Sequence, residues 1–240
     1  ERVALIGQNG AGKTTLARQL NGLLQPTSGA VTIGDWDTRT HTVAQLARHV
    51  GYVFQYPEHQ IFKRSVRDEI AVGPRNLGFD AEHLAAAVDA ALHVTGLTEM
   101  AERHPHDLMP ALRKRVALAS VLAMETPIVV LDEPTTGQDV LGLRLIGEIV
   151  EQLGAAGRTV IMISHDIDFC AAHCQRLIVL SEGRVLLDGP PEIVFARPDL
   201  LAQSAVEPPQ LARLAERLGL PLVWRSEPLL DALAERQSHG

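Results

Sequence analysis

The sequence predicts an α/β protein built around a buried parallel sheet. Three apolar runs, Val3–Ile6, Ile128–Leu131 and Thr159–Ile163, lack the polar alternation of half-exposed strands. Each run leads directly into glycine-rich or charged residues, and helix-like segments lie between the runs. Ligands of such sheets bind beyond the carboxyl ends of the strands, so functional residues are expected there.

Composition narrows the class of protein. The chain has 240 residues, of which 46% are hydrophobic but only 4% aromatic, so an aliphatic core is expected. The formal charge is −7 and no stretch is strongly basic, which argues against a nucleic-acid partner. No apolar run reaches the roughly 18 residues of a membrane span, and no signal peptide is recognisable. A role at a membrane would therefore require docking on another protein. Because Glu1 stands directly before the first strand, further strands are expected upstream.

A phosphate-binding loop follows the first strand. The motif G-x-x-x-x-G-K-[ST] is matched in full, and a helix is predicted over Lys13–Leu20. Glycines let backbone N–H groups turn toward phosphate oxygens, and the helix N-terminus adds its positive dipole end. Lys13 is expected to reach the β- and γ-phosphates, and the Thr14 hydroxyl to bind Mg²⁺. A glycine-rich turn with a chance lysine is disfavoured because strand, loop and helix occur in order. The predicted phosphate-binding residues are Gly7, Gln8, Asn9, Gly10, Ala11, Gly12, Lys13, Thr14 and Thr15.

A pair of carboxylates follows the second run. Asp132 is expected to hold Mg²⁺, directly or through water, and Glu133 to polarise an attacking water. Taken alone, the pair could be a helix N-cap, but the phosphate loop in the same chain favours the metal interpretation. The third run ends at Ser164-His165-Asp166, where His165 could contact a γ-phosphate. Alone, such a histidine would more often be a cap or surface residue.

The order of these motifs, with Val53-Phe54-Gln55 between the first two, resembles the ABC-transporter ATPase family over nearly the whole chain. The resemblance implies a RecA-like P-loop NTPase core with an inserted helical subdomain, and ATP and Mg²⁺ as cofactors. It implies that Gln55 contacts Mg²⁺ and senses the membrane partner, that Glu133 is the catalytic base and that His165 is the switch histidine. Residues 135–139 resemble the D-loop, which crosses the dimer interface.

Three further segments are similar to energy-coupling-factor importers, which take up vitamins, their precursors, cobalt or nickel. These segments are residues 55–62, 72–78 and 119–124. This resemblance implies a transmembrane coupling protein and a substrate-binding membrane subunit as partners, at the cytoplasmic face of the membrane. Two alternatives stay open: a soluble ABC ATPase without a transport role, and a half that binds ATP without hydrolysing it.

The family's signature, Leu-Ser-Gly-Gly-Gln, is degenerate here. Aligning on Arg113-Lys114-Arg115 places residues 108–112, Leu-Met-Pro-Ala-Leu, at the motif. In the family these positions contact the γ-phosphate held by the opposite subunit. Met109 has no hydroxyl and Pro110 has no N–H, so several bonds of about 1.5–3 kcal/mol each are lost if charge-assisted. We expect a partner ATPase domain with an intact signature, as a separate subunit or as the other half of a tandem chain. Alternatively, Arg113 or Lys114 replaces the missing donors.

The resemblance also predicts the domain layout. Residues 1–58 and 125–190 are expected to form the core, 59–124 the helical subdomain and 191–240 a C-terminal tail.

Helices are predicted over 81–94, 112–124 and 141–153, the last with Leu141, Leu145, Ile149 and Leu153 in one buried stripe. Glu182-Gly183 predicts a hairpin. Cys170 and Cys174 are expected to be reduced thiols on one helix face, with a metal site as the minor alternative.

Overall fold

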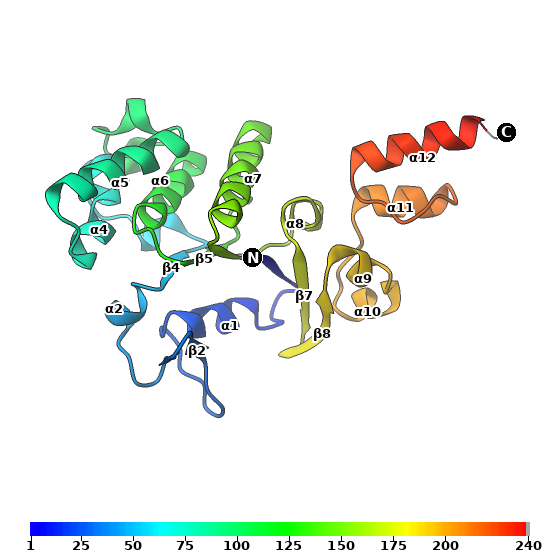
Figure 1. Cartoon of the computed structure of the whole chain (residues 1–240), viewed down its shortest axis with the longest axis horizontal. Helices are drawn as coiled ribbons and strands as arrows, with labels where there is room; N and C mark the ends of the chain where they lie inside the picture. The colour runs from blue at the N-terminus through cyan, green and yellow to red at the C-terminus, as the bar shows by residue number, and fades with distance from the viewer. Residues whose placement is uncertain (239–240) are drawn as a thin grey trace. The chain divides into compact units, whose positions relative to one another are not determined.

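The computed structural model describes residues 1–238, which alternate between strands and helices as expected for an α/β chain (Figure 1). Among these residues no helix is both long and apolar enough to cross a bilayer. The chain divides into two compact units. The first comprises Glu1 and Thr14–Ile161, and the second comprises Arg2–Lys13 and the chain from Met162 onward. The division of the chain into core, helical subdomain and tail stays a prediction.

The strands of the first unit include a parallel pair. Strand β4 (Val50–Val53) pairs with β5 (Ile128–Asp132), with Val53 opposite Leu131. Both strands are almost wholly buried, which explains their continuous apolar sequence. A small antiparallel pair, β2 (Thr32–Ile33) and β3 (Trp36–Asp37), lies earlier in the chain. Strand β6 (Thr159–Ile163) runs from the first unit into the second.

Helices make up the middle of the first unit, where α5 packs on α6 (Figure 1). Helix α5 covers Ala81–Val94 as predicted, because Asp80 caps it by accepting from the backbone N–H of His83. Helix α6 starts at Pro110, two residues before the predicted start, since proline suits the first helical turn. The remaining helical segments are α1 (Lys13–Leu20), α2 (Val43–Leu46), η1 (Pro57–His59), α3 (Val66–Ile70), α4 (Val72–Leu77), η2 (Thr98–Met100), η3 (Pro105–Asp107) and α7 (Val140–Ala155).

The predicted stripe of α7 is wrong at its start. Leu141 is 69% exposed, whereas Ile146, Ile149 and Leu153 are buried. The helix begins at Val140, with Asp139 as its cap, so its first turn presents its apolar side chains to solvent. The buried face is therefore made by the later turns of the helix.

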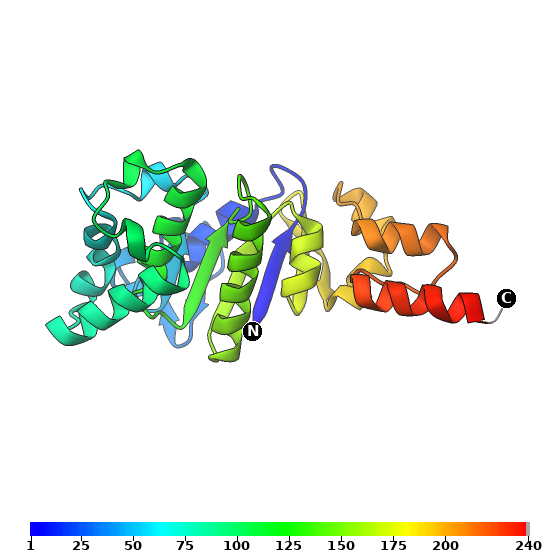
Figure 2. The same ribbon diagram turned by 90° about the horizontal axis from the view of Figure 1, so that it is seen from above.

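Besides the end of β6, the described part of the second unit contains three strands. Strand β1 (Arg2–Ile6) is parallel to β7 (Arg176–Ser181), and β7 is antiparallel to β8 (Arg184–Gly189). The hairpin predicted at Glu182-Gly183 is confirmed, and both residues have positive φ, as a tight two-residue turn requires. The helices of the second unit are α8 (Ile167–His173), α9 (Pro191–Phe195), α10 (Pro198–Gln203), α11 (Gln210–Arg217) and α12 (Ser226–Ser238). Helices α11 and α12 lie side by side, as Figure 2 also shows.

Both cysteines are free thiols. Cys170 lies in α8 and Cys174 at its C-terminal cap, and both are buried. Among residues 1–238 no group of three or more histidine, cysteine, aspartate or glutamate side chains is arranged to hold a metal ion, and none therefore includes this pair.

Candidate nucleotide site

The phosphate loop connects β1 to α1 with a backbone that only glycines tolerate. Gly7, Gly10 and Gly12 have φ of +145°, +81° and +99°. A Cβ atom on Gly7 would lie 2.1 Å from the carbonyl oxygen of Leu180 in β7. The glycines that the sequence motif specifies are therefore required both for the turn and for its close approach to the sheet.

Lys13 folds back over this loop. Its Nζ donates to the carbonyl oxygens of Gly7, at 2.8 Å, and Gln8, at 3.1 Å, and the residue is 6% exposed. A lysine cation beside a curled loop and a helix N-terminus is an arrangement suited to phosphate oxygens. Thr14 follows within the first turn of α1 and is half-buried, while Thr15 is exposed.

His165 lies beside the same loop. It lines a cavity of about 270 Å³ together with Gly7 and Gln8, so the second unit brings the predicted switch histidine to the phosphate loop. The cavity also includes residues 205–208 of the predicted tail, which sequence reasoning did not assign to any site. This segment is attached through Asp168, whose Oδ1 accepts from the backbone N–H of Gln210 at 3.0 Å. No local motif marks such a contact, because the two residues are 42 positions apart.

The carboxylate pair stands at the end of β5 in the first unit. Asp132 is 3% exposed, and its Oδ2 accepts a 2.9 Å hydrogen bond from the Tyr52 hydroxyl on β4. Its other oxygen, Oδ1, is buried and has no hydrogen-bond partner among the described residues. A buried carboxylate oxygen without a donor is costly unless a cation satisfies it. The residues therefore fit a Mg²⁺ ion, which prefers hard oxygen ligands.

Glu133 has a strained backbone, with φ of +52°. Two side chains of the first unit contact it: Lys114 Nζ donates to its carbonyl oxygen at 2.9 Å, and the Thr136 hydroxyl to its Oε2 at 3.4 Å. Burial lowers the pKa of Lys114, while the carboxylates of Glu133, Glu58 and Asp132 oppose that shift. The sequence suggests Lys114 only as a donor to a partner's phosphate, whereas the structure places its Nζ at the Glu133 carbonyl, directly after β5 of its own chain.

Gln55 follows β4 and is half-buried. Its loop is ordered by Gln60, whose Oε1 accepts from the backbone N–H of Phe54 at 3.3 Å. Glu58 in the same loop lies 3.9 Å from Arg113 of α6, so the glutamine loop and the signature helix are connected.

The degenerate signature forms the start of α6. Leu108 is buried, Met109 is 71% exposed and makes no side-chain cap, and Pro110 opens the helix. The Arg113 guanidinium is bound to its own chain, through Nε to the Leu108 carbonyl at 2.9 Å and through Nη2 to the His106 carbonyl at 2.8 Å. Since Lys114 is also engaged, neither cation extends freely from this surface.

The predicted site residues are thus distributed over both units. The second contains Gly7–Lys13 and His165, and the first contains Thr14, Thr15, Gln55, Asp132 and Glu133. In the second unit His165 lines one cavity with Gly7 and Gln8, and in the first unit Asp132 and Glu133 follow one another at the end of β5. The approach of the carboxylate pair to the phosphate loop stays a prediction.

These features define a P-loop nucleotide-binding protein of the α/β class. The sequence model of the ABC transporter family matches residues 1–136. The chain therefore belongs to the ABC transporter family. It is 34% identical to a solved structure from Clostridium perfringens, cbiO1, part of the ABC transporter complex cbiONQ, with a TM-score of 0.75. That comparison covers 92% of this chain and 88% of the other, and it confirms the predicted fold class.

Curated relatives point in the same direction. The chain is 42% identical to the energy-coupling factor transporter ATP-binding protein EcfA of Methanoculleus marisnigri, over 90% of this chain and 79% of the relative. It is 41% identical to a putative ABC transporter ATP-binding protein of Methanosarcina acetivorans, over 92% of this chain. In that second comparison the chain spans 37% of the relative's length.

Proposed function

We propose that this chain binds and hydrolyses ATP as one of two ATPase domains of an energy-coupling-factor importer. It would power uptake of a vitamin, a vitamin precursor or a transition-metal ion. The observation that carries the proposal is the buried, unpartnered Oδ1 of Asp132, next to Glu133, in a chain that also contains a complete phosphate loop. That atom is a ready metal ligand, and Glu133 stands one residue further along.

The described residues would act as follows. Backbone amides of residues 7–13 and the Lys13 ammonium would bind the phosphates, as their curled geometry favours. Thr14, Gln55 and Asp132 would hold Mg²⁺, which when bound neutralises phosphate charge. Glu133 would orient and deprotonate the attacking water, and His165 would stabilise charge on the γ-phosphate.

We further propose that the two ATP sites of the assembled pair differ. The start of α6 offers a thioether and a proline where the family offers a hydroxyl and glycine amides, and Arg113 and Lys114 are bound within the chain. A partner domain with an intact signature would complete the site made by Lys13 and Glu133. The reciprocal site would bind phosphate weakly. The partner is a second ATPase chain or the other half of a tandem protein.

The pair would dock on a transmembrane coupling protein and a substrate-binding membrane subunit, at the cytoplasmic face of the membrane. Co-purification with membranes tests this arrangement against a soluble ABC ATPase. Two relatives support the membrane arrangement: one is an energy-coupling factor transporter ATP-binding protein, and the other is part of the ABC transporter complex cbiONQ.

Turnover measurements test the catalytic part. Glu133→Gln in the complete pair should abolish most ATP hydrolysis while leaving ATP binding intact. Retained hydrolysis would favour the alternative of a half that binds ATP without splitting it. The triple change Met109→Ser, Pro110→Gly and Ala111→Gly should raise turnover at the reciprocal site, and an unchanged rate would argue against asymmetry.

A further inference from the structure

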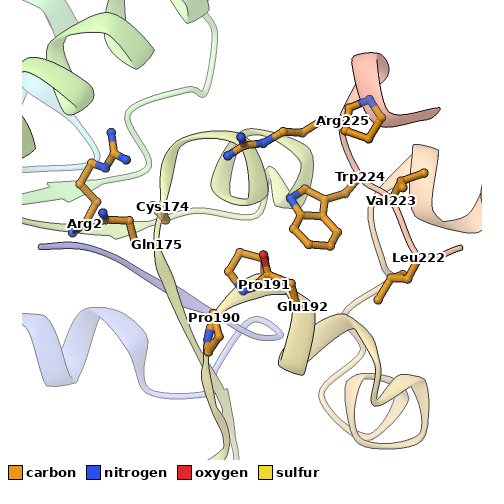
Figure 3. A pocket seen from close by; sticks show the side chains of 11 residues that line it. Arg2, Cys174, Gln175, Pro190, Pro191, Glu192, Leu222, Val223, Trp224 and Arg225 are labelled. Atoms are coloured by element: carbon orange, nitrogen blue, oxygen red, sulfur yellow. Dashed lines mark hydrogen bonds between the residues drawn. The ribbon is translucent and has the colours of Figure 1, made fainter. Parts of the chain in front are cut away.

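A second cavity, of about 480 Å³, lies in the second unit away from the phosphate loop (Figure 3). One wall is made by the start of β1, by the connection from α8 to β7 and by the connection from β8 to α9. The segment between α11 and α12 makes the other wall, with Trp224 and Arg225 side by side. The cavity thus lies between the sheet of the second unit and the predicted C-terminal tail, for which the sequence suggests no role.

The charges around the cavity favour an anion. Arg2 and Arg225 line it, against the single carboxylate of Glu192. The Arg2 guanidinium forms no hydrogen bond or ion pair with the part of the chain that the structure describes. Arg225 donates through Nη2 to the carbonyl oxygen of Ala172 at 3.2 Å, which leaves further N–H groups of its fork for a ligand. Burial raises the pKa of the neighbouring Cys174 thiol to about 12, so this thiol stays neutral and does not repel an anion.

Trp224 supplies an unsatisfied donor. Its Nε1 is buried and has no acceptor among residues 1–238. The indole ring is held edge-on against Phe195, with ring centroids 5.8 Å apart. In Figure 3 the Trp224 and Arg225 side chains extend in the same direction, toward Cys174. A buried indole N–H normally has an acceptor, and an oxygen placed beside the Arg225 guanidinium would provide one.

We propose that this cavity binds a small organic anion, a carboxylate or sulfonate carried on an aromatic or aliphatic body. The anionic oxygens pair with Arg2 and Arg225 and accept from Trp224 Nε1. The apolar body lies against the prolines and against Leu222 and Val223, which also line the cavity. Few polar groups at one end and apolar walls elsewhere are typical of ligand sites.

Fluorescence tests this proposal directly on the full chain. The protein has two tryptophans, so Trp36→Phe leaves Trp224 as the only emitter. The probe is anilinonaphthalene sulfonate, followed by energy transfer from Trp224 in the presence of saturating Mg-ATP, which keeps the dye out of the nucleotide site. Phenyl-naphthylamine, which has a similar aromatic body without the sulfonate, is the matched neutral probe. Arg2→Gln with Arg225→Gln removes both cations, and Arg217→Gln on α11, which removes a cation that does not line the cavity, is the control.

We expect saturable energy transfer from Trp224 to the sulfonate dye. The affinity for the dye should fall at least about tenfold in the double arginine variant and stay unchanged in Arg217→Gln. Binding of the neutral probe should be weaker and insensitive to both changes. Absence of saturable transfer would overturn the proposal. So would an equal loss in the Arg217→Gln control, or equal affinity for the two probes. Thermal midpoints of all variants establish that each is folded before the comparison.

Discussion

The hydrogen bond between Tyr52 and Asp132 gives a sharp test of how the metal-binding carboxylate is held. Tyr52 and Asp132 are 6% and 3% exposed, and their oxygens are 2.9 Å apart. Tyr52→Phe removes only the phenolic oxygen, so packing changes little. The variant leaves a buried carboxylate whose Oδ1 already has no partner. Hydrogen bonds to charged groups contribute about 1.5–3 kcal/mol, and we expect a loss of stability in that range.

Urea unfolding followed by circular dichroism measures this loss. In thermal unfolding of a chain of this length, 1 kcal/mol corresponds to a shift in Tm of roughly 2–4 °C, so Tm should also fall by about 3–12 °C. Tyr56→Phe is the matched control, because Tyr56 is 57% exposed. Mg²⁺ with ATP should recover part of the loss in the Tyr52 variant by satisfying the carboxylate. A loss below about 0.5 kcal/mol, equal to that of the control, would refute the reasoning.

The same pair predicts a dependence on alkaline pH. Burial, and then the neighbouring Asp132 carboxylate, raise the pKa of Tyr52 above the ordinary value of about 10. The unfolded phenol ionises near pH 10 while the folded one keeps its proton. The stability that Tyr52 contributes is therefore complete below about pH 10 and is lost as pH rises further. Stability measured between about pH 8 and 11 should fall less steeply in Tyr52→Phe than in the parent.

Three further predictions follow from named contacts. Gly7→Ala should abolish ATP binding, measured by calorimetry, because its Cβ would meet the Leu180 carbonyl at 2.1 Å; unchanged affinity would contradict the loop geometry. Lys114→Met should lower kcat about tenfold or more with ATP affinity retained, because a bond of about 1.5 kcal/mol to the strained Glu133 backbone is lost; an unchanged kcat would remove its positioning role. Cys174, whose pKa burial raises to about 12, should not react with a thiol reagent at about pH 8 until urea unfolds the chain; rapid reaction of folded protein would refute its burial.

Elements with local signals could be predicted from sequence. The helix over 13–20 and the strand over 159–163 match the structure at both ends, because glycine loops and long apolar runs mark them. Apolar periodicity predicts the start of α6 two residues late, because the proline that opens the helix lies outside the periodic pattern. Leu141 was assigned to a buried stripe because periodicity alone does not show where the packed face of a helix ends.

The contacts that hold the site residues could not be predicted, because they are distant in sequence. Tyr52 lies 80 positions before Asp132, and Lys114 lies 19 before Glu133. The motif states which residues carry the chemistry, but the second layer around them depends on which strands and helices become neighbours. The cavity at Trp224 could not be predicted for the same reason, since its lining combines Arg2 with residues within 174–192 and 222–228.

These contacts also explain how a signature helix can lose its motif and still be retained. Polar side-chain contacts hold α6 and the segment before it in place. Arg113 donates to the Leu108 carbonyl, Lys114 to the Glu133 carbonyl, and Gln138 Nε2 to the Ala111 carbonyl at 3.1 Å. In two of these contacts the acceptor is a backbone oxygen of the degenerate segment, at Leu108 or Ala111. Because a backbone oxygen is present whatever the side chain, these contacts form with Met-Pro-Ala as readily as with Ser-Gly-Gly. The helix can therefore support the catalytic strand of its own chain even where it no longer recognises a partner's phosphate. Under the proposed asymmetry, selection on the first role persists after the second is lost.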